Sequence, residues 1–243
     1  MPSCRSSAIE FPFRRARLSA WVSVLLGLSA ILAPASGSMP IEIPAQSCRN
    51  GHFAVHQGHR FRLGEVQSPT HLYQDEEGCP SAAACQTQTY LRRGAQVILN
   101  QIAGDWACVW HQGQGEAVVG WVPFRQLVLK LPPQASQLQD WLGEWRLLNV
   151  AALRLGLAPD FAFLTLSGEA FWQGAVVNGE AVIHVGELRA SQLRPQGQQL
   201  VYRAGDESWD CRAEMTLLPP YLIVDDNLQC GGMNVSFRGV YRR

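Results

Sequence analysis

Hydrophobic residues in the second half of the chain come in short runs that are separated by glycine, asparagine, aspartate and serine. Runs of this kind lack the 3.6-residue period of an amphipathic helix and predict β-strands joined by short turns. Eight such strands are typical of an up-and-down barrel or a sandwich. We expect them at residues 144–149, 161–166, 170–173, 181–188, 199–203, 211–217, 221–224 and 235–241.

A shorter segment in the middle of the chain, residues 85–130, has a similar pattern. Residues 97–99 are a β-branched apolar run, and Gly104 with Asp105 marks a turn. Residues 106–111 form a second run, and residues 120–123 open the last pair of strands. The segment therefore predicts one small barrel, and the fold class of the whole chain is all-β.

Alternate side chains of the run at residues 106–111 face opposite sides of the strand. Trp106, Cys108 and Trp110 therefore share one face, and Ala107 and Val109 share the other. If the small residues fill the barrel, the tryptophans lie outside, where they either form a recognition surface for a peptide or sugar or pack against the neighbouring domain. The candidate ligand-binding residues are Tyr90, Trp106, Trp110, Trp121 and Pro123.

The segments around these two domains differ from them in composition. Residues 36–84 form a polar lead-in with enough apolar positions for one or two strands. Residues 131–140 contain two adjacent prolines followed by small and amide residues, so they predict a linker rather than a strand. The second domain then covers residues 141–243. We expect its interior to be filled with side chains, since eight strands enclose little more; an open mouth lined by Trp172, Phe161 or Phe163 would instead indicate a ligand.

The first 35 residues have the pattern of an export signal. Arg14, Arg15 and Arg17 precede an apolar run at residues 18–32, which is followed by small residues around Pro34. Serines and a glycine interrupt this run, and it is shorter than a membrane-spanning helix requires. The prediction is a periplasmic or secreted protein that has no stable membrane anchor once the signal is removed.

Six cysteines follow the signal, and an even number in an exported chain predicts disulfide bonds. Four precede the linker and two follow it, so each half can close its own pairs. Cys211 then pairs with Cys230. Three pairings are possible in the first half, and we expect the one that ties a leading segment of the barrel to its central strand: Cys85 with Cys108, and Cys48 with Cys79.

Net charge excludes one class of partner. Removal of residues 1–35 takes four arginines and one glutamate from the 20 basic and 20 acidic residues, which leaves a formal charge of −3. Proteins that bind nucleic acid through phosphate contacts present an excess of basic residues. We therefore expect no nucleic acid partner.

The order of short motifs in the first domain resembles that of a bacterial SH3-like domain. The motifs are Tyr90, Gly94, Val97, Gly104 with Asp105 and Trp106, and Gly120, Trp121, Val122 and Pro123 followed by Leu127. The resemblance implies contact with cell-wall peptide or an envelope protein. Residues 124–127 lack the closing tyrosine of eukaryotic SH3 domains, which argues against binding of proline-rich peptides.

The second domain carries a different resemblance. Gly143, Glu144 and Trp145 at its first strand, with Arg238, Arg242 and Arg243 near the last, resemble the arrangement of lipocalin- and avidin-like barrels. There an early tryptophan packs beneath a late arginine at the closed end of the barrel. Residues 225–242 are also similar to the end of uncharacterised exported proteobacterial proteins that pair an SH3-like module with a β-rich domain, a resemblance that implies no activity.

Residues that could hold a metal ion are few. His52, His56 and His59 lie close together, but no carboxylate stands between them as in the HExxH motif, so we expect surface histidines. Asp225 and Asp226 lie in a loop that lacks the spaced ligands and late glutamate of a calcium site. We expect no metal and no cofactor.

Catalytic chemistry has little support in the sequence. The second domain has paired cysteines and one histidine, His184, and the chain after the signal has no G-x-S-x-G motif. Acidic pairs such as Glu180 with Glu187, or Asp206 with Asp210, leave a glycosidase possible. The prediction is a non-catalytic binding protein. Two alternatives stay open: an inhibitor or envelope-stress interaction protein, and a peptidoglycan-acting hydrolase.

Overall fold

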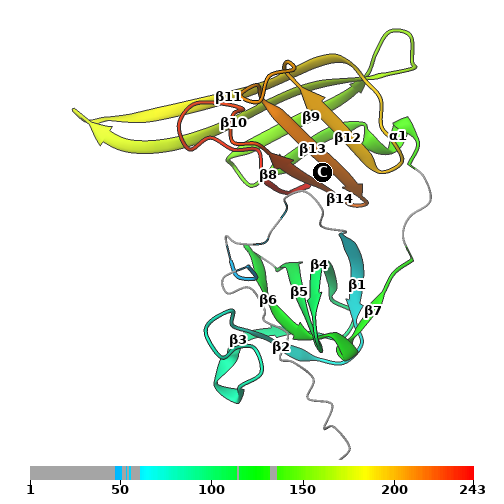
Figure 1. Ribbon diagram of the computed structural model, residues 1–243, viewed down its shortest axis with the longest axis vertical. Helices are drawn as coiled ribbons and strands as arrows, with labels where there is room; N and C mark the ends of the chain where they lie inside the picture. Colours follow the sequence, from blue (N-terminus) through cyan, green and yellow to red (C-terminus); the bar gives the residue numbers. More distant parts are fainter. Residues whose placement is uncertain (1–46, 51–52, 54, 56–60, 114, 132–135) are drawn as a thin grey trace, which may run out of the picture. The chain divides into compact units, whose positions relative to one another are not determined.

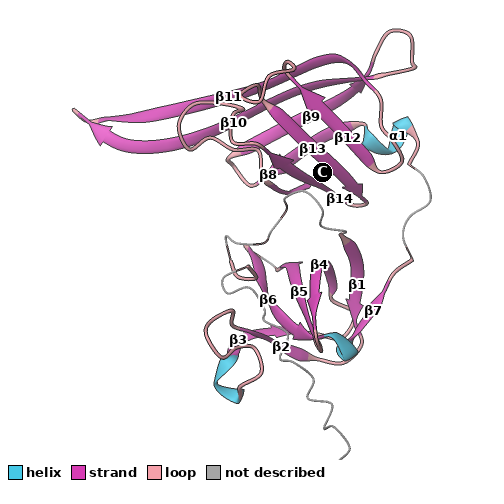
Figure 2. Cartoon of the chain, in the orientation of Figure 1, coloured by secondary structure: helices cyan, strands magenta, loops and turns pink. Residues whose placement is uncertain are grey.

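The computed structural model describes residues 47–50, 53, 55, 61–113, 115–131 and 136–243 (Figure 1). All of them belong to one compact unit, which extends from residue 41 to residue 243. The predicted export signal and His52, His56 and His59 lie outside the described residues. Figure 2 shows that strands make up most of the described chain and that its helices are short. The all-β prediction is confirmed.

The first sheet has seven antiparallel strands within the described residues, in the order β3-β2-β6-β5-β4-β1-β7. The lead-in supplies two of them, so the sheet begins at residue 62, well before residue 85. The strands are β1 (Arg62–Val66), β2 (Thr70–Tyr73), β3 (Gln86–Leu91), β4 (Gln96–Ala103), β5 (Trp106–Gln112), β6 (Ala117–Pro123) and β7 (Leu127–Leu129). Single 3₁₀ turns occur at Ala83–Cys85 and Phe124–Gln126.

Alternation along β5 decides what each face of this sheet packs against. Ala107 and Val109 are fully buried in the core of the sheet together with Val97, Leu99 and Val122. The small residues therefore face inward, and the tryptophans lie on the outer face, as one of the two sequence alternatives required.

The cysteine pairing predicted for the first half is wrong. The structure joins Cys48 to Cys108 and Cys79 to Cys85. The physical reason is the strand order, because β2 and β6 separate β3, which follows Cys85, from β5, which carries Cys108. Cys108 instead faces outward beside the fully buried Trp121, where Cys48 reaches it. The predicted pair Cys211–Cys230 is present.

The carboxylate of Asp75 fixes this outer face. It accepts hydrogen bonds from the backbone N–H of Cys48 at 2.7 Å and from Nε1–H of Trp121 at 3.1 Å, and it is itself buried. A buried charge needs such partners, because burial without them is costly. The disulfide and the carboxylate together hold the segment at Cys48 over β5 and β6.

The second sheet is a nearly closed barrel of eight antiparallel strands within residues 136–243, in the order β11-β10-β9-β8-β15-β14-β13-β12. Its ends, β11 and β12, come close without pairing. The helix α1 (Leu138–Trp141) precedes β8. The strands are β8 (Gly143–Leu147), β9 (Ala151–Leu157), β10 (Leu164–Val177), β11 (Glu180–Leu193), β12 (Gln199–Arg203), β13 (Arg212–Leu218), β14 (Tyr221–Asp226) and β15 (Gly239–Arg242).

Two of the predicted strand boundaries are wrong in an informative way. Residues 161–166 and 170–173 were expected as separate strands, but β10 runs without a turn from Leu164 to Val177. Gly168, between the two expected strands, lies inside β10, where a Cβ would come within 2.5 Å of the Leu153 side chain. Leu153 belongs to β9, a strand that the sequence pattern missed because its alanines and leucines are not typical strand formers.

The interior of the barrel is filled. Inward side chains from every strand form one buried cluster, which includes Trp145, Leu153, Leu188, Phe237 and Tyr241. Trp172 lies outside this cluster and is partly exposed, while Phe161 is exposed at a loop. Trp172 and Phe161, two of the three residues expected at an open mouth, therefore do not enclose an interior site.

Candidate functional site

An arginine stacks on a tryptophan at the first strand of the barrel. The guanidinium carbon of Arg243 lies 4.2 Å from the centre of the Trp145 ring, in cation–π contact. Nε1–H of Trp145 donates to the carbonyl of Trp141 at 2.9 Å, and Arg243 donates to the carbonyl of Asp140. Gly143 leads into this strand with a φ of +123°, a backbone conformation that favours glycine. Of the three arginines near the last strand, Arg243 is therefore the one that packs on Trp145.

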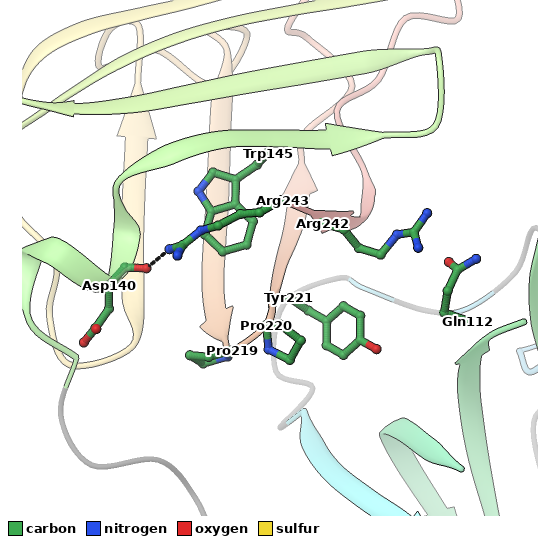
Figure 3. Close-up of a pocket in the computed structure, with 8 residues that line it drawn as sticks. All are labelled: Gln112, Asp140, Trp145, Pro219, Pro220, Tyr221, Arg242 and Arg243. Carbon is green, nitrogen blue, oxygen red and sulfur yellow. Dashed lines mark hydrogen bonds between the residues drawn. The ribbon is translucent and has the colours of Figure 1, made fainter. Parts of the chain in front are cut away.

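A pocket of about 290 Å³ lies beside this tryptophan (Figure 3). The barrel supplies most of its wall from α1, β8, the β13–β14 turn and β15, and β5 of the first sheet adds one amide. The lining residues are Gln112, Asp140, Trp145, Pro219, Pro220, Tyr221, Arg242 and Arg243. The pocket thus combines apolar rings with two guanidinium groups.

The two arginines have different roles, since Arg242 is the last residue of β15 and Arg243 follows the end of the strand. Arg243 points toward Trp145 and Asp140, where its guanidinium is already used. Arg242 is exposed, and Figure 3 shows its side chain extending toward the side of the pocket where Gln112 lies. Arg242 is therefore the cation that this pocket presents to a ligand.

Cross-strand neighbours make the position of Arg242 electrostatically unusual. It lies opposite Tyr221 on β14 and opposite Arg146 on β8. Like charges directly opposite one another destabilise a sheet. Glu144 forms an ion pair with Arg146 and offsets part of this repulsion. An anion bound at Arg242 would offset more of it.

Tyr221 supplies a hydroxyl at the same site. Burial raises the pKa of Tyr221 above its ordinary value of 10, and the positive charge of Arg242 lowers the pKa by a smaller amount. The phenol is therefore neutral at physiological pH, so it can donate a hydrogen bond to an acceptor that Arg242 holds. The edge of its ring packs against Trp110 of β5 at 5.3 Å between ring centres.

The five ligand-binding residues predicted from sequence do not share one exposed surface. Tyr90 is 50% exposed and packs its ring against His71, while Trp106 is half-buried against Tyr73. Trp110, Trp121 and Pro123 are buried. For Trp110 the structure selects the second sequence alternative, because it packs on Tyr221 and Ile223 of the second sheet.

Sequence reasoning did not identify the pocket. Its polar groups come from strands far apart in the chain, and Gln112, Tyr221 and Arg242 carry no recognisable motif. The one available signal was the adjacent pair Arg242 and Arg243. The sequence alone relates both arginines to Trp145 and does not distinguish a separate role for Arg242.

The described residues provide no geometric support for the acidic pairs of a glycosidase or for a metal site. Glu180 and Glu187 lie seven positions apart on the same strand, which is roughly 23 Å at ~3.3 Å per residue and too far for a pair of glycosidase carboxylates. Asp210 accepts a hydrogen bond from the backbone N–H of Glu207 within its own turn. No group of three histidine, cysteine, aspartate or glutamate side chains in the described part of the chain could hold a metal ion.

The fold and pocket define an all-β protein with two antiparallel sheets, three disulfide bonds among its described residues and a cationic surface pocket. Disulfide bonds are typical of oxidising, extracytoplasmic compartments. No helix among the described residues is long and apolar enough to cross a membrane. No protein-family model, curated protein or solved structure matches the chain.

Proposed function

We propose that this protein is a non-catalytic binding protein of the periplasm or the cell exterior, and that the pocket at Arg242 holds a carboxylate of cell-wall peptide. The observation that carries the proposal is the exposed Arg242, whose position on β15 lies opposite the hydroxyl-bearing Tyr221 on one side and a second arginine, Arg146, on the other. Arginine binds carboxylates through paired, charge-assisted hydrogen bonds. The prolines of the β13–β14 turn offer an apolar wall for the rest of the ligand.

Cell-wall peptide suits this pocket because it is short and presents free carboxylates. A volume of about 290 Å³ accommodates a few such residues and not a large folded ligand. The export signal predicted for residues 1–35 would bring the protein to the compartment where this peptide occurs. Gln112 lines the pocket from the first sheet, but its Nε2 already donates to the carbonyls of Gly113 and Gly115, so its Oε1 is the atom left for a donor on the ligand.

The test is titration calorimetry of residues 36–243 with purified stem peptide. Replacing Arg242 with glutamine should weaken binding about 10- to 100-fold, since a hydrogen bond to a charged group contributes about 1.5–3 kcal/mol. Amidation of the peptide carboxylates should weaken binding of the unaltered protein by a similar factor.

A matched control is available in the barrel. Arg203 is also an exposed strand arginine that lies opposite another arginine, Arg212, which pairs with Glu214. Arg203 does not line the pocket, so Arg203→Gln should bind the peptide normally. Equal binding by the Arg242 and Arg203 variants would contradict the proposal. Release of soluble fragments from intact peptidoglycan would contradict it in favour of a hydrolase.

A further inference from the structure

The hairpin of β10 and β11 continues past the other strands of the barrel (Figure 1). β10 pairs with β9 only as far as Ala170, and the two long strands then pair with each other up to a turn at Asn178 and Gly179. Both turn residues have positive φ, as a tight hairpin requires. We call residues 171–185 the arm.

The arm exposes large hydrophobic side chains on both of its faces. The exposed residues are Phe171, Trp172, Val176, Val177, Val182, Ile183 and Val185. A surface hairpin with solvent on both sides is normally polar, and an unpaired strand edge is normally protected by charged residues. The arm has only Glu180 and His184 as titratable residues, so it has the composition of an interface.

One backbone contact shows which groups on the edge of β11 remain available. β11 is a terminal strand of the sheet. At Val185 its outer edge is occupied, because the carbonyl of Val185 accepts a hydrogen bond from the backbone N–H of Gly232 at 3.2 Å. Alternate residues of a strand direct their backbone groups to the same edge. Ala181 and Ile183 therefore face that edge as well, and no strand in the described part of the chain pairs with them there.

We propose that the occupant of this edge is a second copy of the chain, whose β11 pairs antiparallel with β11 about a two-fold axis at Val182. Each Ala181 then lies opposite Ile183 of the other copy, where the available backbone groups meet. Each Glu180 lies opposite His184 of the other copy, so the two titratable residues of the arm complement each other across the interface.

Neighbouring registers fit less well. An axis at Ile183 would place Ala181 opposite Val185, whose carbonyl is already bonded to Gly232. An axis at Ala181 would place Glu180 opposite Val182, and the carboxylate would then have no imidazole opposite it. The axis at Val182 retains the contact at Gly232 and places each carboxylate of Glu180 opposite an imidazole of His184.

A lipid surface is a poorer occupant of the same arm. Segments that insert into membrane interfaces combine apolar side chains with lysine or arginine. The arm has neither, and its tip carries Glu180. Binding of the arm to vesicles is therefore an outcome that would overturn the proposal.

The first experiment uses cysteine substitutions in residues 36–243. Val182 and Val201 are matched, since they are 40% and 39% exposed and lie on the two terminal strands of the same sheet. Under mild oxidation, Val182→Cys should form disulfide-linked dimers at least tenfold faster than Val201→Cys, because two copies meet at Val182. Mass spectrometry would verify that the three native disulfides stay intact. Equal rates would overturn the proposal.

Sedimentation over a concentration series supplies a second, independent measurement. The unaltered protein should show reversible dimerisation, Val182→Lys should be monomeric because two lysines would face each other, and Val201→Lys should dimerise normally. The Arg242→Gln variant should also dimerise normally, so failure of the pocket proposal would leave this result unchanged. The proposal would be overturned if the unaltered protein stayed monomeric at all concentrations. Binding of this monomer to phosphatidylglycerol vesicles through the arm would show that a lipid surface is the occupant instead.

Discussion

The two sheets of this protein are stabilised in different ways. The first has two disulfide bonds and, among its described residues, a core cluster of nine buried apolar side chains. The barrel has one disulfide bond and a cluster of twenty buried side chains within residues 136–243. A small sheet buries too little apolar surface to stabilise itself well. The comparison shows that covalent bonds replace hydrophobic burial where the core is small.

The two sheets also differ in the hydrogen bonds that their buried tryptophans form. Trp121 of the first sheet donates its N–H to a carboxylate, that of Asp75, whereas Trp145 of the barrel donates to a neutral backbone carbonyl. A hydrogen bond to a charged group is the stronger of the two. The first sheet thus relies on polar and covalent ties around Cys48, and the barrel relies mainly on packing.

The largest expected effect comes from the disulfide bond that ties the lead-in to β5. Replacing Cys48 and Cys108 with alanine should lower the free energy of unfolding by about 4 kcal/mol in the chain-entropy model, because their bond closes the longest loop, with a sequence separation of 60. Replacing Cys79 and Cys85, which are separated by 6 residues, should cost about 2 kcal/mol. Urea unfolding followed by tryptophan fluorescence measures both.

The pair Cys211–Cys230, with a sequence separation of 19, is the control in the barrel. Its removal should cost about 3 kcal/mol. A larger loss in the free energy of unfolding on removing Cys211–Cys230 than on removing Cys48–Cys108 would contradict the comparison. The first sheet would then depend on its disulfide bonds no more than the barrel does.

An intermediate effect is expected from phenylalanine at the two tryptophans. Trp121→Phe should cost about 2 kcal/mol, because it removes a hydrogen bond from the buried carboxylate of Asp75. Trp145→Phe should cost about 1 kcal/mol, because its lost acceptor is a neutral carbonyl. Thermal unfolding of each variant is the measurement, and equal losses would contradict the distinction between the sheets.

At neutral pH Tyr241→Phe should cost about 1 kcal/mol, as little as Trp145→Phe, since the Tyr241 hydroxyl donates to the Phe237 carbonyl at 2.8 Å. Burial, and secondarily the charge of Asp226, raise the pKa of Tyr241 far above 10. Its contribution to stability is therefore fully present below pH 10. It is lost above pH 10 by about 1.4 kcal/mol per pH unit, as the unfolded chain ionises first.

Urea unfolding between pH 8 and pH 11.5 tests this alkaline dependence. Tyr241→Phe should have a shallower loss of stability than the unaltered protein, while Tyr90→Phe, at an exposed tyrosine of the first sheet, should lose stability as steeply as the unaltered protein. Identical slopes for the two variants would show that the barrel tyrosine does not control the alkaline dependence.

Much of this fold could be predicted from residues close together in the sequence. Short apolar runs and turn residues fixed the all-β class, parity along residues 106–111 gave the two faces of β5, and the small number of cysteines in the second half left Cys211 and Cys230 to pair. These properties follow from the two-residue period of a strand and from chain connectivity, which are local.

Only the tertiary structure decided which distant segments meet. Strand order separates Cys85 from Cys108, a close approach to Leu153 places Gly168 inside β10, and three strands and a turn bring Gln112, Tyr221 and Arg242 to one pocket. The period of a strand repeats identically in every strand, so it carries no information on which strands become neighbours. That choice depends on side-chain packing summed over the whole core.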